Sequence, residues 1–175
     1  LELSSAASDV YKRQKSMKNL KFGAYTDSTN DFGPVITKQH QQSVINHISS
    51  AEKQGANIVV DGRNAIVSGY ENGFYVGGTL IDKVTPQMDS YKAEIFGPVL
   101  QIVRVATMKD AMSLIDNHEY GNGTCIFTRD GEAARYFSDH IKVGMVGVNI
   151  PLPVPVAYHS FGGWKRSLFG DLHAY

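Results

Sequence analysis

The segment Glu94-Ile95-Phe96-Gly97-Pro98 places a carboxylate two residues before an aromatic ring. A carboxylate has two acceptor oxygens, so Glu94 can accept both hydroxyl groups of a ribose diol. In an extended chain Phe96 projects to the same side as Glu94, where its ring can pack against a flat heterocycle. From these residues alone, a solvated acid that caps a loop is the commoner interpretation of Glu94, because acids are mostly exposed.

Cys125 is the only cysteine and therefore the only thiol that could act as a nucleophile. A nucleophilic cysteine needs access to its substrate and a lowered pKa. Cys125 instead lies in the short apolar run TCIFT, which is typical of a buried strand. We therefore interpret it as a small core residue. The histidines show no metal-ligand spacing with acids or with Cys125, so we expect no metal site.

Periodicity and capping residues predict the elements that position these side chains. A helix is expected from Lys38 to Gly55, with Thr37 as its N-cap. A strand at 58–60, a loop at 63–73 and extended segments at 74–76 and 79–81 follow. In the second half, strands at 99–105, 124–128 and 145–150 alternate with helices that begin after Thr107 and Asp130. This order predicts an α/β fold, a parallel sheet with right-handed crossovers and helices on both faces.

Two segments lie outside this pattern. Pro151, Pro153 and Pro155 predict a long loop at the carboxyl end of the last strand, the edge where open α/β sheets bind ligands. Gly162-Gly163 predicts a tight turn in that loop, and Lys165 and Arg166 after it are interpreted as solvated. Residues 1–14 show no sustained periodicity and are interpreted as a disordered or non-native tail, which leaves one partial domain at 15–175.

Composition excludes several classes of function. Seventeen basic and seventeen acidic residues balance, so nothing favours binding to nucleic acid or to an anionic membrane surface. The longest wholly apolar runs are a few residues and are far too short to span a bilayer. A lone cysteine and the lack of a signal segment favour a cytoplasmic protein. The first residue is Leu1 and the last stretch is polar, so we expect a fragment of a longer chain.

The run KAEIFGPVL at 92–100 resembles the segment with which aldehyde dehydrogenases hold the nicotinamide ribose. Further blocks follow the order of that family: GPVIT at 33–37, ENGFYVGGTLIDKV at 71–84, GNGTCIFTRDG at 121–131, GMVGVNIPLPVP at 144–155 and HSFGGWKRS at 159–167. The resemblance covers residues 15–175 and implies a Rossmann-like sheet that forms most of the catalytic domain. It also implies NAD as cofactor, with Glu94 on the nicotinamide-side ribose and Phe96 against the nicotinamide ring.

The same resemblance places the nucleophilic cysteine and the glycine-rich cofactor elements upstream of this chain, so no catalytic residue is expected within it. The family can place an adenosine-side contact at the position of His40. A surface residue of the helix is the favoured interpretation of that histidine.

Two longer runs, at 69–84 and 153–175, are similar to methylmalonate-semialdehyde dehydrogenases, which release carbon dioxide and form an acyl-CoA. Acid-forming family members usually have a small residue and then Gly-Arg-Glu after FGGxKxS, where this chain has Leu168-Phe169-Gly170-Asp171. This resemblance implies an aldehyde substrate, CoA as co-substrate and a homodimer or homotetramer in the intact parent. Two alternatives stay open: an NAD(P)-dependent dehydrogenase that gives a free acid, and a truncated domain without activity of its own.

Overall fold

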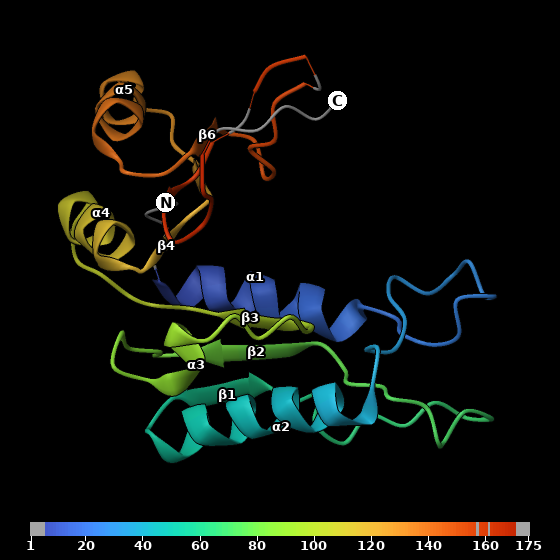
Figure 1. Cartoon of the computed structure of the whole chain (residues 1–175). Helices are drawn as coiled ribbons and strands as arrows, with labels where there is room; N and C mark the ends of the chain where they lie inside the picture. The colour runs from blue at the N-terminus through green and yellow to red at the C-terminus, as the bar shows by residue number, and fades with distance from the viewer. Residues whose placement is uncertain (1–5, 157, 161, 171–175) are drawn as a thin grey trace. The chain divides into compact units, whose positions relative to one another are not determined.

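The computed structural model describes residues 6–156, 158–160 and 162–170, which form two compact units (Figure 1). One unit ends at Arg104 and the other begins at Val105. The first contains α1 (Ala6–Asn19), α2 (Lys38–Lys53), β1 (Asn57–Val60), β2 (Thr79–Asp82), α3 (Asp89–Lys92) and β3 (Val99–Gln101). The second contains α4 (Met108–Asn117), β4 (Tyr120–Gly121), β5 (Gly123–Ile126), α5 (Gly131–His140), β6 (Met145–Val148) and β7 (Trp164–Lys165).

Strand β2 is the centre of the first unit. The sheet order is β1-β2-β3, with β1 antiparallel and β3 parallel to β2. All four residues of β2 are buried, and because side chains alternate along a strand, both faces of the sheet must be covered. Helices α1 and α2 flank the sheet in Figure 1. Ile81 belongs to the core cluster under α2, whereas Met17 and Leu20 of the α1 segment lie over Gly78.

Helix α2 forms as its sequence predicts. The Thr37 side chain accepts a hydrogen bond from the backbone N–H of His40 at 3.1 Å, which caps the first turn. Val44, Ile48 and Ala51 are fully buried along one face. Gly55 follows the helix with a φ of +99°, a conformation that suits glycine. The predicted strand at 58–60 and loop at 63–73 are also confirmed.

The expected irregular tail at 1–14 is wrong for residues 6–14, which belong to α1. Residues 1–5 lie outside the described residues. Met17, the α1 side chain that lies over Gly78, comes after residue 14, so the first fourteen residues alone show no apolar face. That the segment is absent from the natural protein stays a prediction.

In the second unit, α5 connects two parallel strands. β5 and β6 pair in register, from Gly123 opposite Met145 to Ile126 opposite Val148. Both predicted helix starts are confirmed. Thr107 and Asp110 form a reciprocal capping box at α4, and the Asp130 side chain accepts two backbone N–H groups at α5. Phe137 of α5 is fully buried and anchors this unit's core.

The α/β class is confirmed, but the described strands do not form one parallel sheet. They divide into β1-β2-β3, β4-β7 and β5-β6, and the β1-β2 and β4-β7 pairs are antiparallel. No helix lies between β1 and β2, and a connection without a helical crossover returns the chain antiparallel. Residues 74–76 form no strand, and the strands predicted at 99–105 and 145–150 end earlier, at Gln101 and Val148.

Lys165 and Arg166 are not simply solvated, as the sequence had suggested. The Nζ atom of Lys165 donates to the carbonyl oxygens of Ile115, Asp116 and His118 at 2.8, 3.2 and 3.0 Å, at the end of α4. A cation is favourable there because the carbonyl end of a helix carries a partial negative charge. Arg166 pairs with Glu119 at 2.8 Å. The glycine-rich loop is thereby attached to the end of α4.

Among the residues that the structure describes, no helix is both long and apolar enough to cross a bilayer.

Asp82, at the end of β2, forms an ion pair with Arg104, the last residue of the first unit. Asp82, whose side chain is 5% exposed, accepts from Nε and Nη2 of Arg104 at 2.9 and 2.6 Å. These bonds hold the pKa of Asp82 below its ordinary value of 3.8. A lowered pKa means that the ionised carboxylate stabilises the fold above pH 3.8, and that this contribution is lost as the pH falls through the folded-state pKa.

We expect Asp82→Asn to lower the free energy of unfolding by about 2 kcal/mol at pH 7, because Arg104 is left with a neutral partner but stays partly solvated. Urea titrations of the wild-type and variant chains at pH 7, 5 and 3 measure this difference. It is constant from pH 7 to 5 and shrinks at pH 3. The control is Asp139→Asn on the exposed face of α5, and an equal loss in that variant contradicts the assignment.

Candidate functional site

The candidate site is the turn between α3 and β3, which carries Glu94 and Phe96. The intervening Ile95 packs against the core cluster under α2, so it fixes the turn from inside. Glu94 is exposed and Phe96 is 76% exposed. The turn therefore exposes the Glu94 carboxylate and the Phe96 ring to solvent, while the side chain of Ile95 between them packs against the core.

The backbone at Phe96 is strained. Its φ is +52°, in the left-handed region that costs a residue with a Cβ about 1–2 kcal/mol. Sequence reasoning assumed an extended chain through Phe96, and this was wrong at that residue. Such strain persists only where the surroundings impose it, and it concentrates at functional sites. An exposed phenyl ring on a strained turn is typical of a ligand contact.

Gly97 explains how the turn approaches α2. A side chain at this position would collide with both methyl groups of Val44, so only glycine permits the contact. The carbonyl oxygen of Pro98 accepts from the backbone N–H of Thr79 at 2.9 Å, which joins the end of the turn to β2. Helix α2 and strand β2 thus hold the turn from two sides.

His40 was interpreted from sequence as a surface residue of the helix, and the structure gives it a specific partner. Its Nε2 atom lies 2.7 Å from the carbonyl oxygen of Phe96. His40 is four residues before Val44, and Val44 is four before Ile48, so all three lie along the face of α2 that turns inward. That spacing could have shown from the sequence that His40 lies on the inward face of α2, although not which group it meets.

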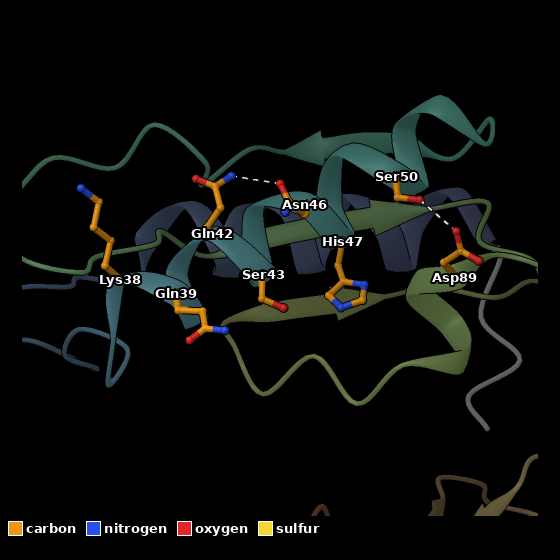
Figure 2. Close-up of a pocket in the computed structure, with 8 residues that line it drawn as sticks. All are labelled: Lys38, Gln39, Gln42, Ser43, Asn46, His47, Ser50 and Asp89. Carbon is orange, nitrogen blue, oxygen red and sulfur yellow. Dashed lines mark hydrogen bonds between the residues drawn. The ribbon is translucent and has the colours of Figure 1, made fainter.

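An open groove on the other face of α2 is the main alternative site. Figure 2 shows its lining, which is Lys38, Gln39, Gln42, Ser43, Asn46, His47, Ser50 and Asp89. Several of these polar groups bind one another. Gln42 donates to Asn46 at 2.9 Å, and Asp89 accepts from Ser50 at 3.3 Å and from Gln54 at 2.9 Å. These bonds attach α2 to α3, so the groove is explained by packing.

Cys125 is half-buried within β5, opposite Gly147 of β6. A side chain at Gly147 would approach the Sγ atom of Cys125, so the sulfur lies over Gly147 on the same face of the β5-β6 sheet. Sequence reasoning interpreted Cys125 as a small core residue, whereas the structure leaves it half-buried at the edge of the second unit's core cluster. Glu94, Phe96 and His40 belong to the first unit and Cys125 to the second.

The loop after β6 is ordered by short contacts of its own. Asn149 adopts a φ of +58°, and its side chain bonds both backbone groups of Thr128, at 2.9 and 3.0 Å. This conformation ends β6 two residues before the sequence predicts. A side chain at Gly144 would collide with the carbonyl of Gly162, so the predicted glycine turn packs directly on the chain before β6. Sequence reasoning missed the role of Asn149.

Within the described part of the chain, no cluster of three or more His, Cys, Asp or Glu side chains could hold a metal ion. The available polar chemistry at the turn is instead an exposed carboxylate beside an aromatic ring, which suits a ribose joined to a flat base.

Comparisons with known proteins agree on one family. The model of the aldehyde dehydrogenase family matches residues 4–174. A malonate-semialdehyde dehydrogenase from Pseudomonas aeruginosa is 64% identical over 166 residues, which are 95% of this chain and 33% of that protein. The chain thus spans about a third of the length of such curated relatives.

Solved structures give the same result. A methylmalonate-semialdehyde dehydrogenase from Oceanimonas doudoroffii superposes with a TM-score of 0.93 and 75% identity, over 98% of this chain and 36% of that one. A protein described as a methylmalonate-semialdehyde dehydrogenase from Sinorhizobium meliloti, complexed with NAD, also gives 0.93, with 55% identity over 96% and 34% of the two chains. This chain belongs to the aldehyde dehydrogenase family.

Proposed function

We propose that the chain is the C-terminal portion of an NAD-dependent, CoA-acylating methylmalonate-semialdehyde dehydrogenase. The observation that carries this proposal is the turn at 94–97, where an exposed carboxylate and an exposed phenyl ring are held on a strained backbone. The relative from Sinorhizobium meliloti, complexed with NAD, supports the cofactor. The names of the relatives from Pseudomonas aeruginosa and Oceanimonas doudoroffii support a short aldehyde that also carries a carboxylate.

In this proposal Glu94 accepts hydrogen bonds from the hydroxyl groups of the nicotinamide-side ribose, and Phe96 packs against the nicotinamide ring. Together they restrict rotation of the ring and keep water from one of its faces. When bound, NAD would supply the acceptor for the hydride released once a cysteine outside this chain has added to the aldehyde carbon; the resulting acyl group would lose its carboxylate as carbon dioxide and pass to CoA. The contribution of this chain is to bind and orient the cofactor.

The remaining features of the proposal concern the intact parent, by which we mean the longer dehydrogenase that contains this segment. We propose that it is a cytoplasmic homodimer or homotetramer whose substrates are the aldehyde, NAD and CoA. The substrate itself has two candidates. The Pseudomonas aeruginosa relative is named for malonate semialdehyde and the Oceanimonas doudoroffii structure for its methylated homologue.

The cofactor role of Glu94 is tested by Glu94→Gln in the intact parent. The amide keeps one acceptor oxygen but lacks the charge and the second acceptor, so we expect the KM for NAD to rise about tenfold. Initial rates at varied NAD, with aldehyde and CoA both saturating, measure this KM. The matched control is Glu132→Gln on the first turn of α5. An unchanged KM in the Glu94 variant contradicts the assignment.

CoA dependence is tested by following NADH and the acyl product of the intact parent with and without CoA. We expect propionyl-CoA from methylmalonate semialdehyde, or acetyl-CoA from malonate semialdehyde, and turnover that stops when CoA is omitted. The physical reason is that the enzyme-bound acyl thioester then lacks its acceptor. Sustained release of free acid without CoA would show an acid-forming dehydrogenase instead.

Cys125 is tested as a nucleophile by Cys125→Ser. Because its sulfur packs over Gly147 on one face of the β5-β6 sheet, we expect kcat of the intact parent to change less than about twofold. We also expect the 175-residue chain alone to form no NADH from any short aldehyde. Turnover by that chain, abolished in the serine variant, is the result that overturns both expectations.

A further inference from the structure

The strained turn at Phe96 is held by one side chain from a distant part of the sequence. The Nε2 atom of His40 lies 2.7 Å from the carbonyl oxygen of Phe96, although the two residues are 56 positions apart. A carbonyl oxygen only accepts, so Nε2 must carry the proton in this bond. The contact therefore fixes both the imidazole and the peptide group between Phe96 and Gly97.

The hydrogen bond from His40 is made at the peptide group next to the strained residue Phe96. A left-handed φ at a phenylalanine relaxes readily unless the neighbouring peptide group is fixed. The carbonyl that His40 binds belongs to that peptide group, so rotation about the Phe96 backbone would break the bond. The imidazole thus constrains the orientation of the same residue whose ring is exposed.

His40 itself is rigidly placed. Its backbone N–H is bound by the Thr37 cap at 3.1 Å, and Val44, one turn later, is fully buried against Gly97. The same helix therefore holds the turn by a hydrogen bond at Phe96 and by an apolar contact at Gly97. The bond adds direction, because packing alone does not fix a peptide plane.

We propose that His40 is a positioning residue for the nicotinamide-side turn: it donates to the Phe96 carbonyl and so holds Glu94 and Phe96 in the geometry that receives the cofactor. This inference rests on the proposed function of that turn. It differs from a direct contact with the nucleotide, because His40 acts through the backbone of Phe96 and needs no bond to the ligand.

The test compares His40→Ala, which has no donor, with His40→Gln, whose side-chain amide can donate to the same carbonyl. Both are made in the intact parent, with His47→Ala as the control. His47 lies on the same helix but lines the polar groove of Figure 2. Should the alanine variant not fold, His40→Leu replaces it, since leucine fills space without a donor.

We expect the non-donor variant to raise the KM for NAD about three- to tenfold, the effect of one lost hydrogen bond, with a smaller change in kcat. Hydrogen exchange at the amides of Gly97 and Val99 in the enzyme without cofactor should rise as well. The glutamine variant restores both measurements toward wild type, and His47→Ala changes neither.

Three results overturn the inference. In the first, the non-donor variant leaves the KM for NAD unchanged although Glu94→Gln raises it. That result overturns the role of His40 but leaves the proposed function of the turn intact. In the second, the non-donor variant has a raised KM for NAD but unchanged hydrogen exchange at the amides of Gly97 and Val99. That result indicates that His40 contacts the cofactor directly. The third is a glutamine variant as impaired as the alanine variant. If Glu94→Gln also leaves NAD binding unchanged, the proposed function of the turn fails together with the inference.

Discussion

Val44, Ile48 and Ala51 hold helix α2 against the sheet, and full burial of a side chain the size of Val44 or Ile48 contributes about 1.5–3 kcal/mol. The candidate site depends on this packing. Val44 sits so close to Gly97 that no side chain fits between them. The approach brings the first turn of the helix within hydrogen-bonding distance of the Phe96 carbonyl. Apolar burial thus holds in place the helix whose contacts at Phe96 and Gly97 maintain the strained backbone.

Local signals in the sequence predicted much of this fold. Thr37, Thr107 and Asp130 each have a side chain that accepts a backbone N–H and so marks where a helix begins. The apolar spacing in α2 and α5 predicted which faces are buried. These features succeed because they depend on neighbours within one or two helical turns.

Long-range contacts account for what the sequence did not predict. Nothing local shows that His40 meets a carbonyl 56 residues away, or that four carbonyl oxygens surround the ammonium group of Lys165. The left-handed backbone of Phe96 is likewise imposed by tertiary contacts, against the preference of the residue. Helix α1 is not evident from residues 1–14, because its contact with the sheet at Gly78 is made by Met17. Each failure concerns a contact that exists only after the chain has folded.

The strain at Phe96 also bears on why a turn, and not a strand, carries the two exposed groups. A regular strand would pair its backbone and point alternate side chains to opposite faces of the sheet. Here Glu94 and Phe96 are exposed and Ile95 is half-buried against the core cluster, but the left-handed φ of Phe96 interrupts the extended backbone before β3 begins at Val99. The ring is therefore exposed beside the sheet and not within it. A rigid sheet, a capped helix and one hydrogen bond together fix a surface that a loop of the same sequence could not maintain.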